Sequence, residues 1–199
     1  MSFDLPPSTE IDRVVPKRTM IEKFSLSGKE RARFDSSIHQ LVITNELSPR
    51  TLNIQSGEIR SIFALRAELR EEDIDARVLS MLFGLIDQRM MIILQYGIRC
   101  KPTIFNDVLI EGDWMLQSEL SLKLNGLDLD EIWKNLVIQI GRIEIEEGNS
   151  LSDQILKNEE RRKTEALIAQ LRDRMMKEKQ PRKKKELFER IRKLEESVR

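Results

Sequence analysis

Cysteine and histidine are almost absent from this chain of 199 residues, which has one of each, Cys100 and His39. A single cysteine excludes a disulfide within the chain and fits a reducing compartment. The pair is too few to complete a zinc site, which usually takes four nitrogen and sulfur ligands. We therefore interpret His39 as a structural hydrogen-bonding residue. Cys100 lies beside Lys101 in a predicted strand, and we do not expect it to be a nucleophile.

Long apolar runs and glycine-rich loops are missing as well. The longest purely apolar run, 90–94, is far shorter than the roughly 20 residues that cross a bilayer. The N-terminal residues around Pro6 and Pro7 lack the basic start and apolar stretch of a secretory signal. Neither Gly84 nor Gly97 belongs to a phosphate-binding glycine pattern. We expect a cytoplasmic protein with no membrane partner and no cofactor.

Charge is present in quantity and is unevenly distributed. The chain has 34 Lys and Arg against 34 Asp and Glu. Residues 157–199 hold 16 cations and 9 carboxylates, a net charge of +7, which leaves −7 for residues 1–156. Only twelve of the 43 residues in this basic segment are apolar, too few for a core of its own. We predict a globular body over 1–150 and a basic helical arm over 151–199, a division that indicates a binding partner rather than a reaction.

The body has the alternating short patterns of an α+β domain. Residues 1–26 are interrupted by prolines and predict an extended lead-in. Ser27 and Glu30 have the spacing of a capping box and predict a helix start. Consecutive short runs favour a mixed or antiparallel sheet flanked by helices. Strands are predicted at 41–44, 58–70, 90–96, 99–104, 108–115 and 118–124, with helices opening at Asp73 and spanning 128–140.

The arm contains two apolar seams that do not share one heptad register. The second seam is displaced by two residues, so a straight helix would place the two on opposite faces. Pro181 lies between them and suits the first turn of a new helix. We predict a C-terminal antiparallel helical (coiled-coil) hairpin, with a solvated single helix or a dimerising coil as the alternatives. The seam residues are Thr164, Ile168, Leu171, Met175, Leu187, Ile191, Leu194 and Val198.

A run of cations is expected at the bend of this hairpin. Clustered cations can contact phosphates and release counterions, or they can dock on an acidic protein surface. No aromatic interleaving or RNA-binding signature supports sequence-specific readout. Protein docking is our preferred interpretation, non-specific nucleic-acid binding is the second, and a homo-oligomer is left open. The expected contact residues are Lys179, Arg182, Lys183, Lys184 and Lys185.

Three carboxylates provide the alternative of an enzyme. Asp107, Glu111 and Asp113 surround a predicted strand hairpin, and two of them would share a face and could hold Mg²⁺. Nuclease sites of this kind place a lysine beside the acids, and this spacing lacks it, since Lys123 follows Glu119 by four residues. We expect no enzymatic activity, with a metal-dependent nuclease as the alternative.

Several short stretches, taken in order, resemble the bacterial family catalogued as domain of unknown function 4391. The resemblance covers nearly the whole chain and ends in its Lys/Glu-rich coiled coil. Individual motifs are short, so the likeness lies in their order and spacing. They are Leu5-Pro6-Pro7-Ser8-Thr9-Glu10, Val15-Pro16-Lys17, Leu47-Ser48-Pro49, Thr51-Leu52-Asn53-Ile54, Leu124-Asn125-Gly126-Leu127-Asp128-Leu129-Asp130, Glu131-Ile132-Trp133 and Ile138-Gln139-Ile140.

The resemblance implies a genomic context and a type of complex, and it implies no catalytic residues. Members of that family are often encoded beside helicase-type restriction subunits and DNA methyltransferases. It therefore implies an accessory or assembly subunit of a bacterial DNA-targeting complex, in restriction or phage defence. Its larger protein partner would be a helicase or methyltransferase subunit.

Overall fold

The chain divides into two compact units in a computed structural model that describes residues 3–198, with side chains through residue 196. The units meet between residues 143 and 144, and we call them the body and the hairpin unit. Arg142 ends the last body helix in a left-handed conformation (φ 47°), and Ile143 is still buried. The chain thus leaves the body earlier than the predicted boundary at 150. None of the described helices combines the length and the apolarity needed to cross a membrane.

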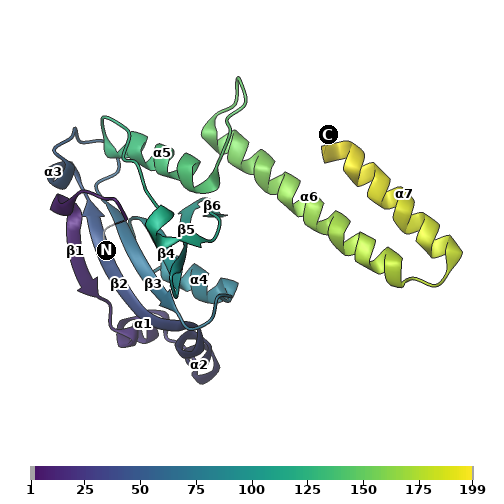
Figure 1. Cartoon of the computed structure of the whole chain (residues 1–199), viewed down its shortest axis with the longest axis horizontal. Coiled ribbons are helices and arrows are strands. Elements are labelled where there is room, and N and C mark those ends of the chain that lie inside the picture. Colours follow the sequence, from purple (N-terminus) through teal and green to yellow (C-terminus); the bar gives the residue numbers. More distant parts are fainter. Residues whose placement is uncertain (1–2, 199) are drawn as a thin grey trace. The chain divides into compact units, whose positions relative to one another are not determined.

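The body is built on one seven-stranded sheet (Figure 1). The strand order is β1-β2-β3-β4-β5-β6, and the short strand β7 also pairs with β5. Only the β3–β4 pair is parallel, and helix α4 makes the crossover between them. The strands are β1 Glu10–Val14, β2 Ile38–Leu47, β3 Ile62–Leu69, β4 Arg89–Tyr96, β5 Arg99–Asn106, β6 Val108–Glu111 and β7 Met115–Leu116.

Helices cover the sheet and supply its core. Met20, Phe34 and Leu82, from three different helices, pack in one cluster with strand residues such as Leu65 and Ile92. Helix α5 packs against β5 and β6 instead. The fold is therefore α+β, as predicted. The helices of the body are η1 Pro7–Thr9, α1 Lys17–Phe24, α2 Gly28–Ser37, α3 Pro49–Leu52, α4 Ala76–Phe83, η2 Gln117–Glu119 and α5 Leu129–Gly141.

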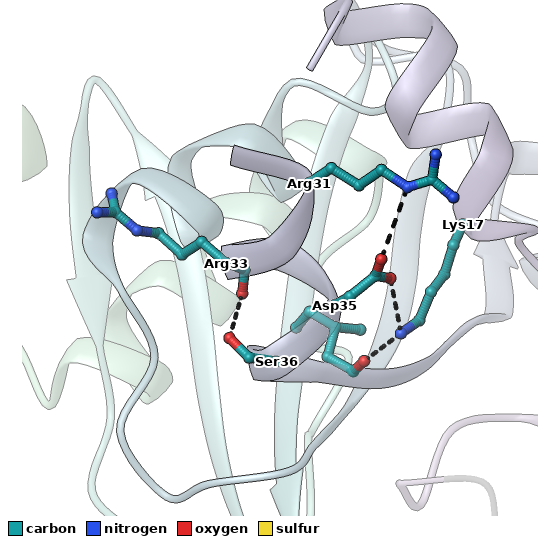
Figure 2. A network of polar contacts seen from close by, with 6 residues as sticks. Lys17, Arg31, Arg33, Asp35 and Ser36 are labelled. Carbon is teal, nitrogen blue, oxygen red and sulfur yellow. Dashed lines mark hydrogen bonds and ion pairs between the residues drawn. The ribbon is translucent and has the colours of Figure 1, made fainter. Parts of the chain in front are cut away.

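A polar network ties α1 to the end of α2, where the chain turns into β2 (Figure 2). The Lys17 ammonium lies 3.3 Å from the Asp35 carboxylate and also donates to the Ile38 carbonyl. Arg31 approaches the same carboxylate from within α2, at 3.8 Å. The predicted extended lead-in over 1–26 is therefore corrected in part: residues 10–14 are an exposed, extended strand, whereas α1 is a packed helix that buries Met20 in the core.

Two further element predictions are corrected. Residues 118–124 are not a strand, although Leu120 and Leu122 alternate with polar residues and are buried. The backbone of Lys123 bonds both ways with the Gln139 side-chain amide, which takes the place of a ladder partner. Helix α4 begins after Asp75 rather than at Asp73, because the Asp75 carboxylate caps the Arg77 amide at 2.8 Å.

The hairpin unit consists of α6 Leu151–Lys177 and α7 Pro181–Val198, which pack against each other (Figure 1). Ser150 caps α6, because its hydroxyl oxygen accepts a hydrogen bond from the Asp153 amide. The same hydroxyl donates a hydrogen bond to the Asp153 carboxylate. Pro181 is the first residue of α7, where the missing amide costs no helical hydrogen bond. The chain therefore reverses at 178–180, and the predicted antiparallel hairpin is confirmed.

Candidate interaction site on the helical hairpin

The two helices of the hairpin unit have a small apolar core of their own, so the expectation that the basic segment has too few apolar residues for a core is wrong. Ile168 and Leu171 from α6 and Ile191 from α7 are buried together. Among the other predicted seam residues, Met175, Leu187 and Leu194 are partly buried against this cluster. Thr164 is half-buried and donates its hydroxyl to the Glu160 carbonyl, while the side chain of Val198 lies outside the described residues. A packed core holds the tip at a fixed distance from the start of α6, about 40 Å away at 1.5 Å per residue.

The tip of the hairpin, residues 177–185, concentrates positive charge. It holds six Lys and Arg and one carboxylate, Glu178. Two of the cations form ion pairs one helical turn away, Arg182 with Glu186 at 3.4 Å and Lys185 with Glu189 at 4.0 Å. Both pairs are largely exposed, so they leave the cations accessible and contribute little to stability.

Glu178 shapes the local charge at the bend. Its carboxylate accepts the Gln180 amide at 2.9 Å, and this bond is the main reason why its pKa is lowered. Lys183 and Arg174 add smaller contributions in the same direction. Glu178 therefore stays ionised and is engaged at the turn. Lys179, Lys183 and Lys184 are exposed around it.

The three carboxylates proposed for a nuclease site lie in different surroundings and share no partner among the described residues. Asp107 lies in the turn between β5 and β6 with a left-handed backbone (φ 61°). Glu111 ends β6 and accepts the Lys101 ammonium at 2.7 Å, across the β5–β6 pair. Asp113 lies beyond the strand and pairs with Arg142 at 2.6 Å. Within residues 3–198, no group of three or more His, Cys, Asp or Glu side chains is arranged to hold a metal ion.

Cys100 lies in a strand and His39 at a helix-to-strand junction, as predicted, while the hydrogen-bonding role of His39 stays a prediction. Cys100 is fully buried in β5, and burial raises the pKa of its thiol, which disfavours the nucleophilic thiolate. His39 is exposed on β2 next to the turn from α2.

Sequence reasoning missed a surface cavity of about 450 Å³ at the start of β3 and β4. Its lining comes from three segments that are far apart along the chain, and it includes Arg60, Gln88 and Phe105. Phe105 also contacts Phe83, with ring centroids 6.0 Å apart, and the two rings line a second, more apolar hollow of about 320 Å³. Both acidic and basic side chains line the larger cavity, so its charge favours neither an anionic nor a cationic ligand. No sequence signal marks it, because only the sheet brings these segments together.

Comparison with known proteins places the chain in a family and gives no activity. The model of the family described as domain of unknown function (DUF4391) matches residues 3–198. The chain therefore belongs to this uncharacterised family, as the resemblance indicated. No curated protein and no solved structure matches the chain.

Proposed function

We propose that this chain is a non-enzymatic accessory subunit that docks on a larger protein through its C-terminal hairpin. The observation that carries the proposal is a self-packed pair of helices, Ile168 and Leu171 against Ile191, that presents six exposed cations at its bend. A helical pair with its own core needs no contact with the body to hold its shape. Such an element is suited to inserting a charged tip into a partner.

The identity of the partner rests on the family resemblance. Helicase-type restriction subunits and DNA methyltransferases, whose genes often accompany this family, are the proposed larger subunits. The proposed setting is a bacterial restriction or phage-defence complex in the cytoplasm, where its DNA target lies.

The test is co-purification of this chain with the adjacent helicase or methyltransferase subunit, both expressed together. A variant truncated after Ile143 should keep a folded body by circular dichroism and lose the partner. A tip variant with Lys179, Arg182, Lys183, Lys184 and Lys185 all changed to Gln should also lose it. The matched control changes Arg161, Arg162 and Lys163 to Gln, three adjacent cations of α6 outside the tip. Undiminished co-purification of the truncated chain would contradict the proposal.

Direct, non-specific DNA binding is the second candidate, and the exposure of Lys179, Lys183 and Lys184 favours it. Cations that neutralise phosphates release counterions, so affinity should fall steeply with salt. Changing Arg182, Lys183, Lys184 and Lys185 to Glu should abolish a salt-sensitive gel shift of the purified chain. A shift that survives this change would remove the tip from any DNA contact.

A further inference from the structure

The hairpin unit has opposite charges at its two ends. Residues 144–160, at the start of α6, hold six carboxylates and one cation. Residues 177–185, at the tip, hold six cations and one carboxylate. The helical residues between 160 and 177 separate the two groups by about 25 Å at 1.5 Å per residue, roughly three Debye lengths at physiological salt. Each end therefore presents its own sign to a partner.

The acidic end presents an apolar side chain among its carboxylates. Ile145 is 44% exposed and lies between Glu144 and the neighbouring Glu146 and Glu147. This loop is fixed on α6 by Gln154, which is 3% exposed. The side-chain oxygen of Gln154 accepts the Glu146 amide at 3.2 Å and the Asn149 side-chain amide at 2.9 Å. Lys157 adds an ion pair to the Glu146 carboxylate, so the loop keeps a defined position.

The basic end presents two large apolar side chains on one flank. Met176 is 77% exposed and Phe188 is 56% exposed. The Arg172–Glu195 ion pair, 2.6 Å long, marks the flank on which α6 and α7 meet. Met176 follows Arg172 by four residues and Phe188 precedes Glu195 by seven, so both lie on that same flank.

Cations border this apolar pair. Lys184 precedes Phe188 by four residues in α7, so it lies on the same flank. Lys179 lies in the bend between the two helices, three residues after Met176. Both lysines are exposed. The flank therefore combines an apolar centre with a cationic rim. Its chemical complement is an apolar side chain between carboxylates, which is what the Ile145 loop offers.

Both features face the same side of α6. Gln154, which holds the loop, and Arg172, which marks the flank, are eighteen residues apart, about five turns at 3.6 residues per turn. Residues separated by whole turns lie in line along a helix. One neighbouring molecule that lies along this side of α6 can therefore contact both the acidic loop and the flank with Met176 and Phe188.

We propose that two copies of this chain pair through their hairpin units, side by side and antiparallel, about a two-fold axis. Ile145 of each copy then packs on Met176 and Phe188 of the other, while Glu144 and Glu147 face Lys179 and Lys184. A two-fold axis forms each contact twice, so one flank is complementary to itself. A parallel arrangement would bring like charges together and is disfavoured. The pairing goes beyond the proposed docking role and shares Lys179 and Lys184 with it, while Arg182, Lys183 and Lys185 stay available for docking in the dimer.

The first test is the mass of the purified full-length chain by light scattering and sedimentation over a range of concentration and salt. We expect about twice the chain mass of 23.4 kDa at low salt, and dissociation as salt screens the exposed charges. Phe188→Asp should weaken the dimer by roughly 100-fold or more, since two buried aromatic contacts are lost at once. Leu156→Asp is the matched control, because Leu156 is also 56% exposed and lies on the far side of α6 from Arg172.

The second test exchanges the charges. One variant carries Glu144→Lys and Glu147→Lys, and the other carries Lys179→Glu and Lys184→Glu. Each alone should be monomeric, because both of its contacts would join like charges. An equimolar mixture should form a heterodimer, because both contacts then join opposite charges. Circular dichroism of each variant checks that the helices are retained.

Three results would overturn the pairing: a wild-type monomer at every concentration, a dimer indifferent to Phe188→Asp, or a mixture that stays monomeric. A monomeric wild type that binds single-stranded DNA through the flank would assign the patch to nucleic acid instead. Loss of the dimer in Phe188→Asp with unchanged co-purification of the larger subunit would leave docking intact. Loss of docking in the truncated chain says nothing about the dimer, so the two failures are distinguishable.

Discussion

The Arg172 guanidinium on α6 donates to the Glu195 carboxylate on α7 over 2.6 Å, and this pair fixes which turns of the two helices face each other. From this register the last turns of α7 lie beside the middle of α6. The start of α6 extends beyond the C-terminal end of α7 (Figure 1). Both partners are substantially exposed, so the pair marks the register more than it stabilises the hairpin.

The stability of the hairpin should depend on its small apolar core. Ile191→Ala removes a buried side chain that packs on Ile168 and Leu171, and it should cost about 2 kcal/mol or more. Amides of α6 and α7 should lose protection in hydrogen exchange, while amides of the sheet keep theirs. Arg172→Ala is the control and should cost under about 1 kcal/mol. Equal losses for the two variants would contradict a core-stabilised hairpin.

The start of β3 should depend on Asp130. Its carboxylate accepts the amides of Glu58 at 2.8 Å and Ile59 at 3.3 Å, which joins the N-terminal turn of α5 to the segment that leads into β3. Asp130→Ala should lower the free energy of unfolding of the body by about 1–2 kcal/mol, because two amides lose an ionised acceptor. Thermal melts followed by near-ultraviolet circular dichroism would measure the loss.

Gly57 provides an independent check on the same contact. A side chain at Gly57 would place its Cβ 1.9 Å from the Asp130 carboxylate oxygen. Gly57→Ala should therefore displace Asp130 and destabilise the body as well. In the Asp130→Ala background the additional cost should shrink, since the obstructing oxygen is gone. Additive losses would show that the two residues act separately.

Acid should weaken the first turn of α6. The pKa of Asp153 is lowered chiefly by the Ser150 hydroxyl and then by the Ser150 amide. A lowered folded-state pKa means that the stabilisation is complete above the ordinary aspartate value of about 3.9 and is lost as pH falls through the folded value. Ser150→Ala should move the Asp153 pKa upward, as measured by carbon-13 titration of its carboxyl. Ser152→Ala, which alters no cap, should leave it unchanged.

The Lys101–Glu111 pair should stabilise the β5–β6 edge only as a pair. Its 2.7 Å contact is largely shielded from water, with about a quarter of each side chain exposed. Glu111→Leu alone leaves an uncompensated ammonium and should cost about 1–2 kcal/mol. Adding Lys101→Met should recover most of that loss, because two apolar side chains replace the pair. A double mutant as unstable as the sum of the two single mutants would contradict this coupling.

Elements with strong periodicity could be read from the sequence. Ile132, Trp133 and Leu136 recur at helical spacing, and α5 buries all three as predicted. Ser27 and Glu30 also form the predicted contact, with the Ser27 amide donating to the Glu30 carboxylate at 2.9 Å. Signals of this kind are local, since the residues that carry them lie within one or two turns.

Elements without such a pattern were missed or misplaced. Strand β1 is exposed along its whole length, so Ile11 and Val14 show no inward-facing alternation. Leu120 and Leu122 do alternate, yet their segment bonds to the Gln139 side chain instead of a strand. The cavity near Phe105 could not be predicted, because its lining residues are neighbours only across the sheet.

The sequence by itself determined the class of the body, the break at Pro181 and the charge of the arm, because each follows from residue type and local spacing. Only the tertiary structure decided the parallel β3–β4 pairing, the separation of Asp107, Glu111 and Asp113, and the flank that Met176 shares with Phe188. These depend on which distant segments pack together, a choice made by the burial of apolar surface over the whole unit and not by neighbours along the chain.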